Sequence, residues 1–270
     1  MNLLFCGDVM GRAGRLAIET HLPRLKRELM LDFVIANGEN AAGGYGITGA
    51  LCQELFDAGV DVITSGNHIW DQREIVTVFA REPRLLRPQN YPAATPGTGV
   101  NRYQTQRGQT VAVINVMGRL FMDPLDDPFA CVEAALAAHA LGAGADAIVI
   151  DVHGEAASEK QAIAHMVDGR ASLVVGSHTH SPTADSMILD GGTAFQTDAG
   201  MCGDYNSVIG GDRQLWVEKF RSKMPVGRIN SSDGEGTLCA VFIETVEHSG
   251  LARRIAPVVV GGRLAQRWPG

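Results

Sequence analysis

The feature that constrains this fold most is a series of short apolar segments that end in polar side chains able to bind a ligand. Short apolar runs bounded by turn-forming residues are typical of buried strands, and the helical segments between them indicate βαβ units. Because ligands bind at the carboxyl ends of the strands in such sheets, we expect these ends to meet at one place. The five ends carry Asp8, Glu39 with Asn40, Asn67 with His68, His153, and His178 with His180.

The first two thirds of the 270-residue chain alternate strand and helix patterns. Thr48 is a residue type favoured at a helix N-cap. A hairpin is expected over 103–106 and 110–116. The expected strands are 2–7, 33–36, 60–64, 147–152 and 173–175, and the expected helices are 12–30, 48–58, 71–80, 127–141 and 158–166.

The last third has a different pattern, with strand-like segments and a single helix expected over 213–223. We interpret it as a meander-like β region that follows the βαβ units. The pattern favours two packed sheets with helices outside, in one domain spanning 1–270. The alternation alone also permits a doubly wound fold. The late strands are expected over 185–189, 193–196, 238–246 and 252–260.

Composition restricts the partners of the chain. It has 45% hydrophobic and 20% charged residues, which is the balance of a folded globule. The net charge of −7 disfavours general binding to nucleic acid, which needs a basic face. A small anionic substrate stays compatible with this charge, because a bound metal can reverse the field in one pocket.

Membrane insertion and secretion are not expected. No apolar run approaches the roughly 18–20 residues that span a bilayer, and the N-terminal residues lack the basic region of a signal peptide. The five cysteines are widely scattered and form no CxxC pair, which favours reduced thiols. We therefore expect a cytoplasmic protein.

The side chains at the five strand ends suit a pair of metal ions. A carboxylate can bridge two cations about 3.5–4 Å apart, and such a pair polarises phosphoryl oxygens and lowers the pKa of a bridging water molecule. Imidazole and carboxylate ligands together suit manganese, iron, zinc or cobalt better than calcium.

These motifs, in their order from Asp8 to His180, resemble the calcineurin-like metallophosphoesterase superfamily. Two departures are informative. Met10 stands where the superfamily pattern has a histidine, and Glu39, followed by Asn40, stands where a bridging aspartate is usual. Together with the segments 7–11 and 197–203, these departures resemble the bacterial YmdB-like branch over nearly the whole chain.

The resemblance implies a four-layer αββα sandwich with a dinuclear centre of divalent or trivalent ions. The implied metals are iron and/or manganese, with zinc, cobalt and magnesium as alternatives. Asn40 would replace the missing histidine, or act only as a hydrogen-bond donor beside the metals. Asp8, Asn40 and His180 would hold one metal, Asn67, His153 and His178 the other, and Glu39 would bridge them.

Several neighbouring residues are assigned other roles. The resemblance makes His68 the phosphate-contacting catalytic residue, which would protonate the leaving oxygen or stabilise charge. Tyr45, in a glycine-rich loop, is a candidate for stacking on a base of the substrate. Asp151 and Glu155 flank His153 and could support it or be purely structural. Trp70, Trp216 and Trp268 are expected to be packing residues.

The implied function is metal-dependent phosphodiester hydrolysis of 2′,3′-cyclic and/or 3′,5′-cyclic nucleoside monophosphates, by in-line attack of a metal-bridging hydroxide. Spacing alone does not select nucleotides over other phosphoesters. The alternatives are a phosphomonoesterase or nucleotidase, and a regulatory nucleotide-binding protein in which hydrolysis is incidental. The irregular segment 201–236 and the resemblance also lead us to expect a homo-oligomer.

Overall fold

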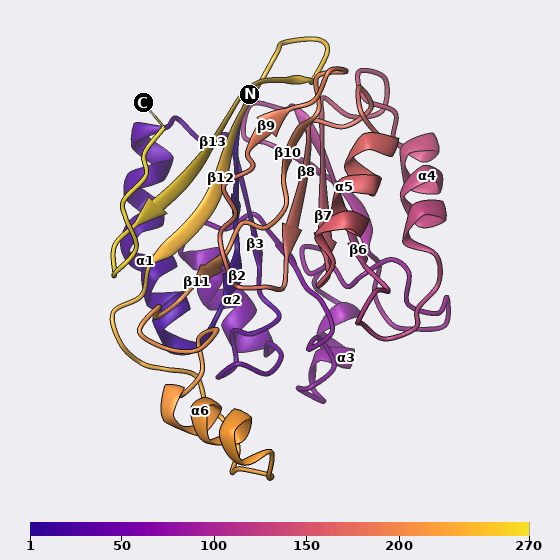
Figure 1. Cartoon of the computed structure of the whole chain (residues 1–270). Helices are drawn as coiled ribbons and strands as arrows, with labels where there is room; N and C mark the ends of the chain where they lie inside the picture. The colour runs from indigo at the N-terminus through magenta and orange to yellow at the C-terminus, as the bar shows by residue number, and fades with distance from the viewer. Residues whose placement is uncertain (270) are drawn as a thin grey trace.

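Two β-sheets form the centre of the computed structural model, which describes residues 1–269 (Figure 1). The first sheet has the order β13-β12-β1-β3-β4 and the second β5-β6-β7-β8-β10-β9. The first contains β1 (Asn2–Cys6), β3 (Phe33–Asn37), β4 (Val62–Thr64), β12 (Leu238–Thr245) and β13 (Ala252–Val260). The second contains β5 (Val100–Gln104), β6 (Thr110–Met117), β7 (Ala147–His153), β8 (Leu173–Ser177), β9 (Met187–Ile188) and β10 (Ala194–Gln196).

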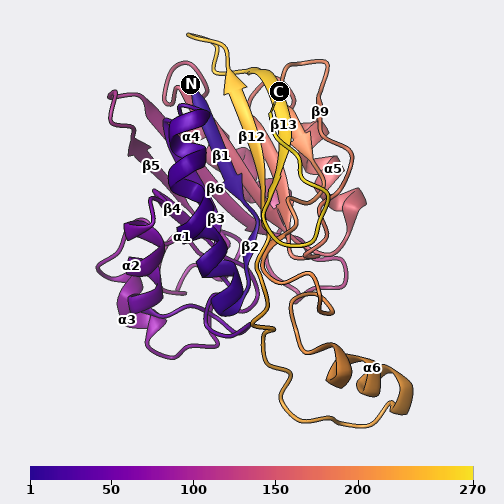
Figure 2. The same cartoon turned by 90° about the vertical axis from the view of Figure 1, so that its left-hand side faces the viewer.

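Helices cover the outer face of each sheet, which confirms the four-layer αββα sandwich (Figures 1 and 2). The first sheet is covered by α1 (Gly11–Glu28), α2 (Gly49–Asp57) and α3 (Ile75–Phe79). The second is covered by α4 (Pro128–Ala138) and α5 (Ala157–Met166). The predicted cap of α2 is confirmed, because the Thr48 side chain accepts a hydrogen bond from the Leu51 amide at 3.2 Å.

Successive side chains of a central strand pack alternately against the helices that cover its sheet and against the other sheet. In β1, Leu4 and Cys6 pack toward the helices, whereas Leu3 and Phe5 pack between the sheets. In β7, Val149 packs between the sheets and the next residue packs against α4 and α5. Since successive side chains of a strand point to opposite faces, these central strands are apolar on both faces.

The predicted meander was wrong, because the late strands are divided between the two sheets. The β9–β10 hairpin extends the second sheet, while β12 pairs antiparallel with β1 and carries β13 at the edge of the first. A hairpin pattern shows that two strands pair with each other and does not show which sheet they join. A short parallel pair, β2 (Asp8–Val9) with β11 (Met201–Cys202), was not predicted.

Two elements are shorter than predicted. The helix expected over 71–80 contains only α3, because side chains at its start serve the neighbouring loops. There the Asp71 carboxylate lies 2.7 Å from the ring of His68, and the Gln72 amide donates to the Tyr45 carbonyl. The strand expected over 185–189 is reduced to β9.

The sheets position the functional loops because their central strands run parallel. β1, β3 and β4 are parallel neighbours in the first sheet, as are β6, β7, β8 and β10 in the second. Their carboxyl ends therefore deliver the predicted ligands to one edge of the sandwich. Among the described helices, none combines the length and apolarity required to cross a membrane.

Candidate metal centre and substrate pocket

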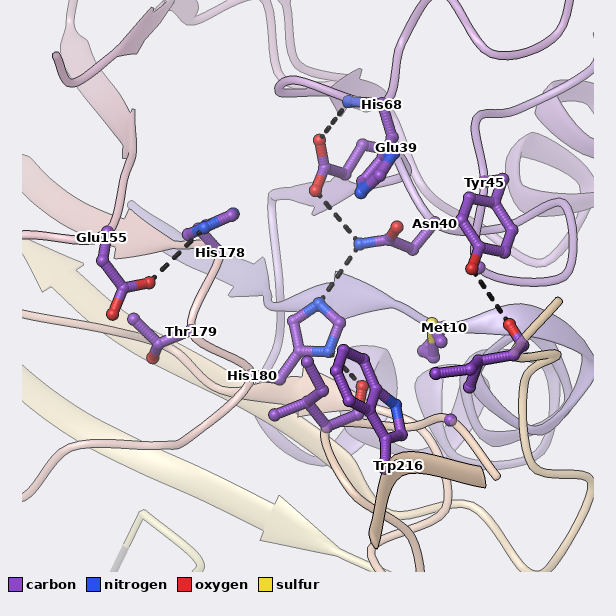
Figure 3. A pocket seen from close by; sticks show the side chains of 14 residues that line it. Met10, Glu39, Asn40, Tyr45, His68, Glu155, His178, Thr179, His180 and Trp216 are labelled. Atoms are coloured by element: carbon purple, nitrogen blue, oxygen red, sulfur yellow. Dashed lines mark hydrogen bonds and ion pairs between the residues drawn. The ribbon is translucent and has the colours of Figure 1, made fainter. Parts of the chain in front are cut away.

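The predicted ligands lie at and beneath a pocket of about 360 Å³ (Figure 3). One side of it is polar, and the other is mostly apolar. The polar lining consists of Glu39, Asn40, His68, Glu155, His178, Thr179 and His180. The remaining lining consists of Met10, Gly44, Tyr45, Ile209, Gly211, Trp216 and Ile229. The structure joins all seven predicted ligands through contacts of 4.0 Å or less.

Glu39 lies at the centre of this cluster. Its Oε1 atom is 3.1 Å from Asn40 Nδ2 and 3.1 Å from His153 Nε2, so it faces both predicted sets of ligands. Its Oε2 atom accepts a hydrogen bond from the His68 amide at 3.0 Å. Burial acts to raise the pKa of Glu39, but the charge and hydrogen bond of His153 outweigh it and lower the pKa to about 2.

Asp8 has a buried oxygen atom that no described residue satisfies. Its Oδ2 accepts from the His178 amide at 3.0 Å, whereas Oδ1 has no hydrogen-bond partner. Oδ1 lies 3.9 Å from His180 Nε2 and 4.0 Å from His153 Nδ1. Burial raises the pKa of Asp8 to about 6, although both histidines oppose the shift. A buried oxygen without a partner is costly, and a cation would satisfy it.

His153 and His178 direct ring nitrogens at each other. His178 Nδ1 lies 3.1 Å from His153 Nε2, and Asn67 Oδ1 lies 3.1 Å from the same atom. Nitrogen ligands of one ion lie about 3 Å apart when metal–nitrogen bonds are near 2.0–2.1 Å. The arrangement therefore fits a shared cation. Glu39, His153 and His178 offer ligand atoms within 4.8 Å of one another.

The two imidazoles differ in charge preference. Burial acts to lower the pKa of His153, but Glu39, Asp8 and Asp151 outweigh it and raise the pKa to about 9. For His178, burial and then the charge of His153 lower the pKa to about 3. The centre thus favours positive charge next to its carboxylates, and a bound cation would supply that charge in place of the proton on His153.

His180 has its tautomer set by the backbone. Its Nδ1 atom lies 2.7 Å from the Ile209 carbonyl oxygen, which can only accept, so Nδ1 carries the proton. The lone pair of Nε2 then faces the Asn40 Nδ2 atom at 3.2 Å. Asn40 is therefore in contact with both His180 and Glu39.

A buried ion pair supports the segment that carries His178 and His180. Lys160 Nζ donates to the Ser177 carbonyl at 2.8 Å and to Asp198 at 2.9 Å, and Asp198 accepts from the Thr179 amide at 3.1 Å. Both side chains are about 1% exposed. The pair thereby fixes the backbone on each side of His178, which has the unusual φ of 101°. Strained backbone persists only where its surroundings determine it.

Sequence reasoning missed Lys160, although a signal was present. In α5 it is buried on the same face as Ile163 and Ala164, at helical spacing. A lysine in the apolar stripe of a helix requires a buried acidic partner, because an unpaired buried charge is strongly destabilising.

Asp151, whose role the sequence left open, supports His153 through a hydroxyl group. Its Oδ1 accepts from Ser177 Oγ at 2.7 Å, and Ser177 Oγ lies 2.9 Å from His153 Nδ1. The other oxygen accepts from Thr64 and Asn37. Such partners orient an imidazole toward a metal and fix its tautomer. Glu155 instead lies at the pocket, 3.5 Å from His178 Nε2.

Gly66 explains how β4 can approach the centre so closely. A Cβ atom at this position would lie 2.1 Å from the ring of His153 and 2.4 Å from Glu39 Oε2. Any larger residue would displace two of the predicted ligands. The glycine therefore permits the following residues, Asn67 and His68, to reach the pocket.

His68 and Tyr45 form one wall. His68 Nδ1 lies 2.7 Å from Asp71, and its ring meets that of Tyr45 edge-on with centroids 5.6 Å apart. The Tyr45 hydroxyl donates to the Ile229 carbonyl at 3.0 Å, and the Arg228 guanidinium lies 4.8 Å from the Tyr45 ring centroid. Trp216 was predicted to be a packing residue, and that prediction did not include its place in the lining of the pocket.

Comparison with known proteins identifies the family. The sequence model described as YmdB-like protein matches residues 4–258. The chain belongs to the YmdB-like family. A Bacillus subtilis (strain 168) relative, named 2′,3′-cyclic-nucleotide 2′-phosphodiesterase, is 43% identical over 260 residues, which cover 96% of this chain and 97% of the relative.

Two solved structures resemble this YmdB-like chain closely. A hypothetical protein from Thermus thermophilus has a TM-score of 0.90 at 41% identity, covering 97% of this chain and 100% of the other. A protein described as a novel phosphatase from Mycoplasma pneumoniae has a TM-score of 0.89 at 29% identity, covering 97% and 93%. The predicted fold and family are thus both confirmed.

Proposed function

We propose that this chain is a metal-dependent phosphodiesterase that hydrolyses cyclic nucleotides, either 2′,3′-cyclic or 3′,5′-cyclic nucleoside monophosphates. The observation that carries the proposal is the position of Glu39, whose carboxylate faces two groups of ligand atoms beside an open pocket. The printed name of the Bacillus subtilis relative supports a cyclic nucleotide as substrate.

We assign the seven side chains to two cation sites that share Glu39. Asp8, Asn40 and His180 would hold one cation, and Asn67, His153 and His178 the other. The unsatisfied Asp8 Oδ1 and the facing nitrogens of His153 and His178 support this division. The family resemblance implies iron or manganese as the metals, and mixed nitrogen and oxygen donors are also compatible with zinc, cobalt and magnesium.

When bound, the cations would polarise the phosphoryl oxygens and lower the pKa of a water molecule for in-line attack. The side chains of the pocket would position the substrate and supply a proton to it. The contact between His68 Nδ1 and Asp71 leaves Nε2 as the ring atom able to reach a phosphate oxygen. We therefore assign His68 to stabilise charge on the phosphate or to protonate the leaving oxygen, and Tyr45 to contact the substrate beside it.

A preference for diesters tests this proposal against a phosphomonoesterase, which the name of the Mycoplasma pneumoniae structure favours. With manganese or iron present, we expect faster turnover of bis(p-nitrophenyl) phosphate than of p-nitrophenyl phosphate, and turnover of 2′,3′-cyclic AMP or 3′,5′-cyclic AMP. The release of nitrophenolate and of nucleoside monophosphate measures both. A strong preference for the monoester would overturn the assignment.

We further propose that residues 1–270 act as one domain in the cytoplasm and assemble as a homo-oligomer. The five free cysteines support a reducing compartment. The helix α6 (Arg213–Ser222), which lies apart from the sandwich in Figure 2, supports assembly because its apolar residues Val217 and Phe220 are exposed. A monomer mass in light scattering would contradict the oligomer.

A further inference from the structure

The apolar side of the pocket is not explained by the proposed metal ligands. Three of its side chains, Ile209, Trp216 and Ile229, belong to one segment of the chain, residues 208–231. In Figure 3, Trp216 lies at the opposite end of the view from Glu39 and His68, with His180 between them. The pocket of about 360 Å³ falls within the range of small-molecule sites, about 300–1,000 Å³. It therefore has room for more than a phosphate group.

This segment projects from the sandwich and carries α6. None of the described residues of α6 is buried, and both overall views show the helix set apart from the layers (Figures 1 and 2). A short helix that buries no side chain contributes little to folding, since helical stability in proteins comes mainly from tertiary packing. The structure shows a different contribution of α6, which is that it places the side chain of Trp216 at the pocket.

Trp216 is held in place by local contacts. The Asp212 side chain caps the helix by accepting two backbone N–H groups at 2.9 Å each. The Phe220 ring stacks against the indole with centroids 5.5 Å apart, and Lys219 Nζ lies 4.7 Å from the indole centroid. These contacts restrict the rotamers of Trp216. The apolar wall is thus preformed, which lowers the entropic cost of binding a flat ligand.

We propose that Trp216, with Ile209 and Ile229, forms the subsite for the nucleobase of the substrate. The inference rests on the proposed function, because the phosphodiester must first lie at the polar side of the pocket. The nucleoside then extends across the pocket to the apolar wall. Aromatic side chains bind all bases through their π-faces and apolar edges. We therefore expect efficient hydrolysis to require a base on the substrate, with little discrimination among the bases.

The test compares two substrates that share the reacting group. One is 2′,3′-cyclic AMP, and the other is methyl β-D-ribofuranoside 2,3-cyclic phosphate, which lacks the base. Trp216→Ala should reduce kcat/KM for the nucleotide by about 5- to 150-fold, mostly through KM, and change it for the base-free substrate by less than about threefold. Trp216→Phe, which retains an aromatic ring, should recover most of the loss.

Glu218 supplies the matched control. It lies two residues after Trp216 in α6, is exposed and does not line the pocket. Glu218→Ala should therefore match the wild type with both substrates. An equal loss of kcat/KM for both substrates in Trp216→Ala would contradict the subsite, because it would show that the tryptophan only maintains the shape of the pocket.

A binding measurement separates this inference from the proposed function. In a His68→Ala background, which we expect to retain its metals while turnover is slow, titration with 2′,3′-cyclic AMP should produce a saturable quench of tryptophan fluorescence that Trp216→Phe removes. A quench that persists unchanged in Trp216→Phe, or no quench at all, would overturn the subsite. Failure of the wild type to hydrolyse either substrate would overturn the proposed function, and the fluorescence titration would still decide whether the base is bound.

Discussion

Replacing Glu39 by glutamine is expected to reduce hydrolysis of cyclic nucleotides to background while the protein remains folded. The amide has nearly the same shape as the carboxylate and can still accept the hydrogen bond of the His68 amide. It loses the negative charge that faces Asn40 and His153 at 3.1 Å each. Because a neutral amide cannot bridge two cations effectively, we expect a rate loss of at least about 10³-fold, the scale of losing an essential electrostatic group.

Steady-state kinetics with 2′,3′-cyclic AMP measures this loss, and circular dichroism checks the fold. Glu155→Gln is a matched control, since that carboxylate is 52% exposed and lies 3.5 Å from His178 without contacting the other ligands by any described interaction. It should retain most activity. If Glu39→Gln hydrolyses the substrate at a tenth of the wild-type rate or more, the bridging role is wrong.

The same variant decides between the enzyme and the regulatory alternative. A protein that acts only by binding nucleotides should support its cellular role when hydrolysis is lost. Loss of the cellular phenotype along with hydrolysis would support the phosphodiesterase. An unchanged phenotype in cells that carry Glu39→Gln would favour regulation, with hydrolysis incidental.

His68→Ala is expected to slow turnover by about 10²–10⁴-fold, the usual range for a positioned acid–base group, with metal content unchanged. The hydrogen bond that the structure describes between His68 and Glu39 comes from the His68 backbone amide, and alanine retains that amide. The ring, by contrast, faces the pocket and is held by Asp71. The loss should appear mainly in kcat, because the group acts on the reacting phosphate.

Elemental analysis of the same preparation provides the second readout. His165→Ala serves as the control, because this histidine is exposed on α5 and does not line the pocket. It should leave both rate and metal content unchanged. Reduced metal content in His68→Ala would make His68 a ligand and would remove it from the role of proton donor.

The clustering of the proposed ligands could be predicted from sequence because it depends on a local rule. Each of these residues lies at or after the end of an apolar strand, and parallel strands deliver their carboxyl ends to one edge. Asp8 after β1 and His153 at the end of β7 lie in different sheets, yet both were expected at one centre. The resemblance supplied the pairing of ligands, which alternation alone did not determine.

Features that depend on long-range packing could not be predicted in the same way. The hairpin β12–β13 gave no indication that it would pair with β1. Trp216 lies among other apolar residues of α6, and only the folded chain places it at the pocket that His180 also lines. Likewise, Lys160 and Asp198 are 38 residues apart, and no local pattern connects them.

The metal content of the purified wild-type protein tests the central claim most directly. After loading with manganese or iron and removal of free metal, inductively coupled plasma mass spectrometry should find two ions per chain. Asp8→Ala should retain fewer, since it removes the unsatisfied oxygen. A wild-type protein that folds correctly and yet retains no metal under these conditions would contradict the account.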